Sequence, residues 1–361
     1  MLTTVSLRPE RSRARASAVD ERGVSPARSS ARPAAGFVLA TVAIALGVLA
    51  LLLTAASAAA VDALVLGVRA AGTGAGLVAV GVLAFLVLVH DGHGREAADL
   101  GRLLRWAALT GIAAAVMRLP LEAATVAGTG LSGVTEPGVW PIVAATGGFA
   151  SAAVRIVGLA GLCIVATRPE QLLLYPRSRR GPRRHPVRLG IATAGAVLVV
   201  TSFILTGHAA TGQPQLLIVP AHLLHTATAS LWLGGLAALA TVLRRREDPA
   251  GVATVVTRFS SVAAVAVAGL VPAGVLLGWS ELGSLSALTG SGYGRTLLLK
   301  SAPVVVVLAV AAYNRWRLAP SIHTGGGEAR PRLRRTLVVE ISGLGLAVLA
   351  TAALTVSQPP G

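Results

Sequence analysis

The sequence predicts an all-α membrane protein, a polytopic transmembrane helical bundle of about nine spans. Of its 361 residues, 54% are hydrophobic and only 13% are charged, about half the charged fraction of an ordinary soluble domain. The hydrophobic residues gather in runs that suit a hydrocarbon layer of about 30 Å, which needs roughly 20 residues of helix. These runs are rich in Gly, Ala, Ser and Thr, the small residues through which membrane helices approach one another closely.

The expected spans divide the chain into three parts. Residues 1–36, rich in Arg, Ser and Pro, predict a disordered tail. Residues 37–186 hold four spans, and residues 187–361 hold five. The spans are 37–60, 73–89, 103–118, 142–166, 187–206, 217–243, 252–279, 296–314 and 336–356. The first has an alternative, because residues 57–60 (Ser-Ala-Ala-Ala) are typical of a signal-sequence cleavage site, and cleavage would leave eight spans.

The positive charges indicate orientation rather than a nucleic-acid partner. The formal charge is +17, yet basic residues separated by long apolar runs do not form the continuous patch that nucleic acid binding needs. Of the 32 Lys and Arg residues, 27 fall in the tail and in alternate loops. Because cytoplasmic loops carry the excess of Lys and Arg, we expect a multi-pass protein of the bacterial cytoplasmic membrane, in contact with the lipid bilayer. Its N-terminus would lie inside and its C-terminus outside.

Three of the seven histidines are expected to meet at the outer face. His208 ends the fifth span, while His222 and His225 begin the sixth. Pro220 suits the first turn of a helix, so we expect the sixth helix to start just before it. His222 and His225 would then share one face of the first two turns. The partial positive charge of the helix N-terminus there favours the neutral imidazole that binds metals.

A simpler interpretation is that these histidines are polar residues hydrogen-bonded to neighbouring carbonyl groups. Their convergence on one uncharged mouth favours a metal site, since ionisable residues inside membranes are functional by default. Imidazole suits copper, zinc, iron and nickel alike, so the donor type alone predicts a transition metal or haem. The single cysteine, Cys163, excludes a disulfide framework and the common cysteine-based zinc sites.

Short motifs in the second half of the chain resemble the copper resistance D (CopD) family of membrane proteins. The resemblance covers about residues 200–356 and rests on the combination of motifs. They are Thr206-Gly207-His208, His222-Leu223-Leu224-His225, Leu231-Trp232-Leu233-Gly234-Gly235-Leu236, Arg258-Phe259-Ser260, Tyr293-Gly294-Arg295, Leu297-Leu298-Leu299-Lys300 and Ala312-Tyr313-Asn314-Arg315. The first four spans carry no motif of comparable specificity.

The resemblance implies copper transport or homeostasis across the cytoplasmic membrane. It implies copper, in an oxidation state that the sequence leaves open, and an extracytoplasmic CopC-like copper-binding partner. Carried over by matching position, His208, His222 and His225 are the implied copper ligands. The remaining motif residues are expected to serve packing rather than metal binding; they are Trp232, Gly234, Gly235, Tyr293 and Lys300. For Lys300, the simpler interpretation is that its side chain extends to the membrane interface.

Three further residues are secondary candidates. Glu281, in the expected outer loop after the seventh span, could add a carboxylate ligand, although a solvated loop acid is the simpler interpretation. His90 and His93 flank Asp91 at the cytoplasmic end of the second span. They could form an exit site for the metal, and a polar start to the loop is the alternative.

Two other functions stay open from the sequence. One is a haem-binding electron-transfer protein whose axial histidines come from two helices. The other is a factor for copper-oxidase assembly that does not transport copper. An enzyme is not expected, because the chain has no Gly-x-Ser-x-Gly elbow, phosphate loop or His-Glu-x-x-His motif. The oligomeric state stays open.

Overall fold

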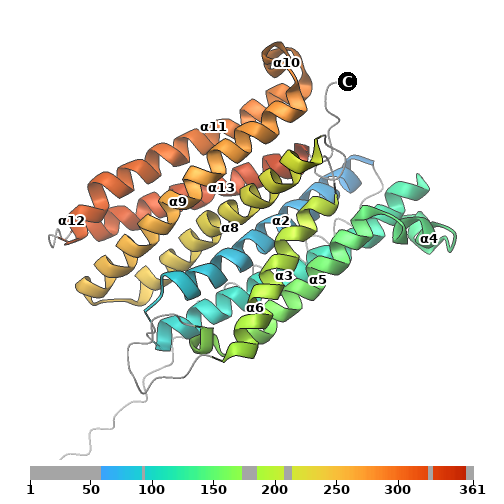
Figure 1. Ribbon diagram of the computed structural model, residues 1–361. Coiled ribbons are helices and arrows are strands. Elements are labelled where there is room, and N and C mark those ends of the chain that lie inside the picture. Colours follow the sequence, from blue (N-terminus) through green and yellow to red (C-terminus); the bar gives the residue numbers. More distant parts are fainter. Residues whose placement is uncertain (1–57, 92–93, 173–184, 207–213, 324–327, 355–361) are drawn as a thin grey trace, which may run out of the picture. The chain divides into compact units, whose positions relative to one another are not determined.

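The computed structural model describes residues 58–91, 94–172, 185–206, 214–323 and 328–354. Over these residues the regular secondary structure is helical and includes no strand, which confirms the predicted all-α fold class. Eight of the described helices are long and apolar enough to cross a membrane (Figure 1). They correspond to the second to ninth expected spans. The expected first span, 37–60, lies outside the described residues except for its last three.

The bounds of the helices, in chain order, are α2 (Ala58–Leu88), α3 (Gly94–Ala127), η1 (Gly130–Thr135), α4 (Val139–Ala144), α5 (Gly147–Val165), η2 (Pro169–Leu172), α6 (Pro186–Ser202), η3 (Phe203–Leu205), α8 (Gln215–Arg245), α9 (Pro249–Leu282), α10 (Leu285–Gly290), α11 (Gly292–Tyr313), the π-helical turn η4 (Asn314–Leu318), α12 (Ala319–His323) and α13 (Ala329–Leu354).

Helices α2 and α8 are the two most enclosed spans and lie against each other at the centre of the bundle. Their closest approach is at Gly81 and Gly234. A Cβ atom on Gly234 would lie 2.6 Å from the Cα of Gly81 and 2.7 Å from the carbonyl oxygen of Val78. These distances are too short for any side chain, so the contact requires glycine. Trp232, two residues earlier on α8, is 1% exposed.

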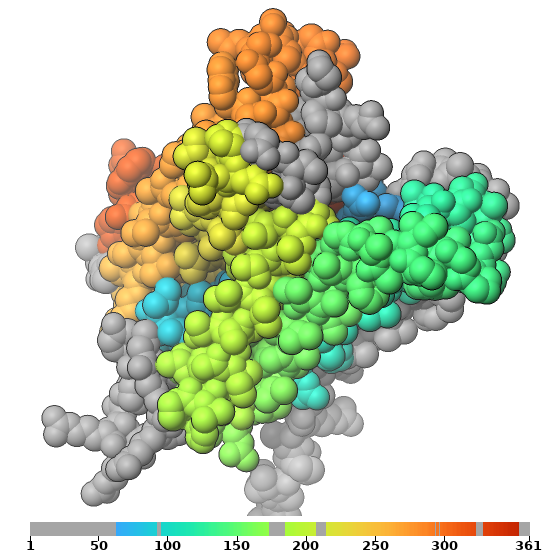
Figure 2. All heavy atoms as spheres, turned by 45° about the vertical axis from the view of Figure 1, so that its right-hand side comes forward, coloured from blue at the N-terminus to red at the C-terminus, as the bar shows by residue number. Residues whose placement is uncertain are grey.

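The other helices pack on the two sides of this central pair (Figure 1). On one side α3 packs on α2, α5 on α3, and α6 on α5. On the other side α9 packs on α8, while α13 packs on α2 and pairs with α11. Figure 2 shows α5 and α6 side by side along one face of the molecule. Apolar side chains exposed along these two helices suit contact with lipid; they include Val157, Ile164, Val187 and Val197.

The second and third spans are longer than the sequence predicted. Helix α2 starts well before residue 73 and includes Arg69, and α3 runs on through Arg118, Pro120 and Glu122. The expected outer loop 118–141 is therefore helical over its first part. Arg118 Nε lies 3.7 Å from Glu122 Oε2, one turn further along α3. Because opposite charges four residues apart stabilise a helix, these charged residues continue α3 instead of ending it.

The predicted start of the sixth helix was also wrong. Helix α8 begins at Gln215, with Pro214 as its N-cap in an extended conformation, and Pro220 lies inside the helix. Neighbouring helices and local adjustments can satisfy the backbone groups that a proline leaves unpaired inside a transmembrane helix. His222 is thus in the third turn and not in the first. The argument from the helix N-terminus loses its basis, because that effect falls off within one turn.

A buried arginine joins α5 to the end of α6. Arg155 is 8% exposed, and its Nε donates a hydrogen bond of 2.9 Å to Ser202 Oγ. Its guanidinium carbon lies 4.1 Å from the centre of the Phe203 ring, within the range of a cation–π interaction. The hydroxyl of Ser151 donates to the Ser202 carbonyl oxygen at 2.7 Å. The charge inside α5 therefore has polar and aromatic partners from the neighbouring helix.

The glycine contact between α2 and α8 yields a stability prediction. Replacing Gly234 with Ala should destabilise the protein by about 1–3 kcal/mol, because overpacking at a backbone contact forces the helices apart. Gly67→Ala in α2 is the matched control, since a Cβ there meets no atom within 4 Å. Thermal unfolding of the purified variants in detergent measures the difference. Equal transitions for the two variants would contradict the role of this contact.

Candidate metal sites and an intramembrane cavity

His225 on α8 is held against α9 by its ring. Its Nδ1 lies 3.4 Å from the carbonyl oxygen of Leu270 on α9. A carbonyl can only accept a hydrogen bond, so this contact places the proton on Nδ1 and leaves Nε2 with a lone pair for a metal. Gly274 makes room for the ring, because a Cβ at that position would lie 3.1 Å from His225 Cε1. The local geometry therefore presents a ligating tautomer.

His222 lies three residues before His225, and the two rings are close enough to interact electrostatically. The i, i+3 spacing places both on one face of α8. His208 falls within 207–213, outside the described residues, so the three-histidine site stays a prediction. Glu281 lies near the end of α9 rather than in a loop. Whether its carboxylate joins the histidines also stays a prediction.

Lys300 on α11 is a charged neighbour of this histidine pair. Its ammonium group lies close enough to His225 for its charge to act on the ring. Lys300 and His225 belong to separate sequence motifs, which the packing of the helices brings together. A positive charge at this position opposes a bound cation, so Lys300 should weaken metal binding here. Tyr293 is the other motif residue at this end of α11, and its side chain is outside the part of the structure that is described.

His90 lies at the opposite end of the bundle, just after α2, in a cluster of charged residues. It is 0% exposed, and neither ring nitrogen has a hydrogen-bond partner among the described residues. Its Nδ1 is 3.5 Å from Asp91 Oδ1 and 4.0 Å from Glu96 Oε2. One ligand atom from each of these three residues lies within 4.8 Å of the other two. His93, the second predicted exit residue, lies outside the described residues.

Arg246, directly after α8, binds both carboxylates of this cluster. Its guanidinium donates to Asp91 at 2.6 and 2.9 Å and to Glu96 at 2.6 and 2.8 Å. A further donor reaches the carbonyl oxygen of Gly251 on α9 at 3.1 Å. Burial lowers the pKa of Arg246, but the hydrogen bonds and charges of Asp91 and Glu96 outweigh it, and the net shift is upward. The cluster thus connects α2, α3, α8 and α9 at this end, which we call the Arg246 end.

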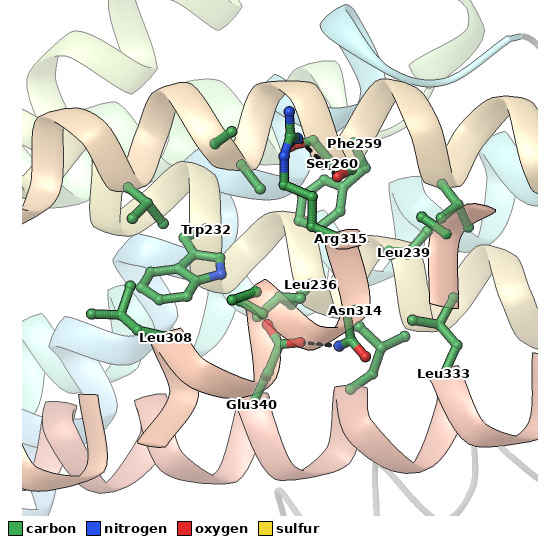
Figure 3. Close-up of a pocket in the computed structure, with 18 of the residues that line it drawn as sticks. Trp232, Leu236, Leu239, Phe259, Ser260, Leu308, Asn314, Arg315, Leu333 and Glu340 are labelled. Atoms are coloured by element: carbon green, nitrogen blue, oxygen red, sulfur yellow. Dashed lines mark hydrogen bonds between the residues drawn. The ribbon is translucent and has the colours of Figure 1, made fainter. Parts of the chain in front are cut away.

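Between the two ends, a cavity of about 350 Å³ lies among α8, α9, α11, the π-helical turn η4 and α13 (Figure 3). Most of its wall is apolar, including Trp232, Phe259 and Leu308. Its polar residues include Glu340 of α13 and Asn314 of η4. Glu340 is 2% exposed and Asn314 is 8% exposed. The Asn314 amide donates a hydrogen bond to Glu340 Oε1.

Glu340 is a candidate functional residue that the sequence analysis missed. The sequence does distinguish this residue, because Glu340 is the single acidic residue of the expected span 336–356. An ionisable residue within a membrane span is a functional candidate by default. Trp232, expected to pack only, forms part of the same cavity wall and lies within hydrogen-bonding range of Glu340. Gly235, the other motif glycine, contacts the ring of Phe259.

Fold and side chains together define a polytopic membrane protein with ionisable groups at both ends and in the middle of its bundle. Two family profiles match the chain: Copper resistance protein D over residues 253–355, and Copper resistance protein D-like, N-terminal domain, over residues 60–216. The chain belongs to the CopD family, as its motifs predicted. The N-terminal match extends the likeness to the spans that carried no recognisable motif.

One similar curated protein is the Copper transport protein CutJ of Bacillus subtilis (strain 168). It is 34% identical over 157 residues, which are 43% of this chain and 28% of that protein. The aligned part thus spans just over a quarter of the relative. No solved structure matches the chain.

The Arg246 cluster yields a second stability prediction. Arg246→Met should cost about 3–5 kcal/mol, because removing one partner of a buried ion pair leaves the carboxylates uncompensated. Arg332→Met is the control, since Arg332 pairs with Glu328 on the surface, where ion pairs contribute at most about 1 kcal/mol. Thermal unfolding in detergent compares the two variants. A loss no larger for Arg246→Met than for the control would contradict a structural role for the cluster.

Proposed function

We propose that this protein moves copper ions across the bacterial cytoplasmic membrane and that His222 and His225 receive the ion. The observation that carries the proposal is the placement of His225. Its Nδ1 faces a carbonyl oxygen of α9, which leaves Nε2 for a metal, and His222 lies one turn away. Membership of the CopD family and the copper transport protein among its relatives support copper as the cargo. His208 completes the proposed ligand set.

The proposed orientation places the histidine pair outside and the Arg246 end in the cytoplasm. The support is the uneven distribution of Lys and Arg over the loops. The chain has no recognisable nucleotide-binding motif, so the proposed transport is not driven by ATP bound to this chain. A separate CopC-like copper-binding protein outside the membrane is the proposed donor.

The cluster around His90 is the proposed exit. His90 Nδ1 with one oxygen each from Asp91 and Glu96 provides three donor atoms of the types that bind borderline divalent metals. Arg246 already holds both carboxylates, so an arriving ion would compete with its guanidinium. Such competition favours release over storage. His93 is the proposed fourth member of this exit.

The entry site is tested by replacing both histidines. His222→Ala with His225→Ala should lower the copper affinity of the purified protein at least tenfold and should abolish copper accumulation by cells that express it. His185→Ala is the matched control, because His185 is exposed at the start of α6 and its side chain caps no backbone group. Isothermal titration and cellular copper content are the measurements. Unchanged affinity in the double variant would overturn the assignment.

Two further measurements separate the other functions. A factor for oxidase assembly would change oxidase activity while leaving cellular copper unchanged in a deletion strain. A haem protein expressed with sufficient haem would show a Soret band. Either result would replace the transport proposal.

Removing the charge of Lys300 tests the same site through an expected increase in copper affinity. Because its positive charge acts on His225, Lys300→Gln should raise copper affinity at the histidine pair at least threefold. Lys300→Arg keeps the charge and is the control, with affinity expected to stay close to that of the unmodified protein. Titration of both variants with copper measures the effect. An affinity unchanged in Lys300→Gln would place the metal away from His225.

A further inference from the structure

Glu340 lies in the middle of the bundle and forms no ion pair within the described part of the chain. It is 2% exposed and belongs to the membrane-spanning part of α13. No Lys, Arg or His among the described residues forms an ion pair with it. The groups that act on its carboxyl are Asn314 and Trp232, and neither carries a charge. A lone carboxylate is costly in an apolar environment unless it is protonated or pairs with a cation.

The one basic residue on the cavity wall is directed elsewhere. Arg315 of η4 donates to the carbonyl oxygen and to the hydroxyl of Ser260 on α9, at 2.7 and 3.0 Å (Figure 3). The part of the wall formed by α8 includes Trp232, the part formed by α11 includes Leu308, and α13 adds Leu337 beside Glu340. Among the described residues that line the cavity, Arg315 and Glu340 are the two with ionisable side chains.

Asn314 is the second polar residue of the site. Its amide nitrogen donates to Glu340, and its Oδ1 is buried without a hydrogen-bond partner among the described residues. An orphaned buried acceptor is expensive, and a cation or a proton donor in the cavity would satisfy it. Asn314 begins the π-helical turn η4, and π-helical insertions in membrane and soluble helices are frequent at functional sites. Glu340 and Asn314 therefore line the same cavity and are joined by a hydrogen bond.

We infer that Glu340 and Asn314 form an exchange site inside the membrane, at which the Glu340 carboxylate holds either a proton or a copper ion. This inference rests on the proposed copper transport. When the ion arrives, the O–H bond of the carboxylic acid breaks, a carboxylate–copper contact forms, and the proton leaves to water. Exchange with Cu(I) leaves the charge of the site unchanged. Oxygen donors bind copper weakly, which suits passage because a conducted ion must also leave.

The position of the site fits a route between the two ends. Trp232 follows His225 by seven residues on α8, which is roughly 10 Å along a helix, toward the Arg246 end. Glu340 lies beside Trp232 at the cavity. An ion that leaves the histidine pair and moves toward the His90 cluster would therefore reach the depth of Glu340 on the way.

The test uses the full-length protein in liposomes that contain a pH-sensitive dye. Cu(I), kept reduced with ascorbate, is added outside, and copper uptake and luminal pH are followed together. The unmodified protein should take up copper while the lumen becomes more alkaline. Glu340→Gln should lower both signals at least tenfold while copper affinity at the histidine pair stays the same. Glu340→Asp, which keeps a carboxylate, should retain measurable coupled exchange. Glu328→Gln, an exposed residue before α13, should behave like the unmodified protein.

The outcomes separate this inference from the proposed function. Copper uptake without a pH change in the unmodified protein would overturn the exchange site and leave transport intact. Equal coupled signals for Glu340→Gln and Glu328→Gln would also overturn it. Loss of both signals in Glu340→Asp as well as Glu340→Gln, with unchanged thermal transitions, would show that the position matters but that the carboxylate does not exchange protons. No copper uptake by the unmodified protein would overturn the proposed function itself.

Discussion

The contact between α2 and α8 at Gly81 and Gly234 is the one on which the rest of the bundle depends. Inside a membrane, lipid tails are as apolar as leucine, so helices associate through close packing rather than through the hydrophobic effect. Because these glycines bring two backbones into contact, α8 lies along the axis of the molecule. The histidine pair therefore lies toward one end of the bundle and Arg246 at the other, with Trp232 between them at the cavity.

The second constraint is that every charge inside the bundle needs a partner. Arg155 has a serine hydroxyl and an aromatic ring, and Arg246 has two carboxylates. Glu340 departs from this rule, and His90, although it lies near two carboxylates, forms no hydrogen bond through its ring among the described residues. Among the described residues, Glu340 has polar neighbours but no counter-charge. A stable fold without a ligand gains nothing from such groups, which is why we connect both of them to a moving ion.

Hydropathy predicted most of the fold, because the spans are long and apolar. It placed the ends of helices poorly where charged residues occur. Arg69 and Arg118 marked the limits of the expected second and third spans, yet both lie inside helices. A count of apolar residues treats every charge as a break and does not recognise that Arg118 pairs with Glu122 within the same helix. Pro220 does not mark the start of α8 for a related reason, since a proline that suits a helix start is also tolerated inside a membrane helix.

The sequence by itself determined the class of protein, the order of its helices, the family and the spacing of His222 and His225, because each of these depends on residues close together in the chain. Only the tertiary structure decided which polar groups meet. Arg246 binds Asp91, 155 residues away. Glu340 of α13 accepts a hydrogen bond from Asn314 of η4. These pairings depend on how each helix is rotated about its axis. Periodicity reveals that rotation weakly in a membrane protein, because the side chains that face lipid are as apolar as those that face the core.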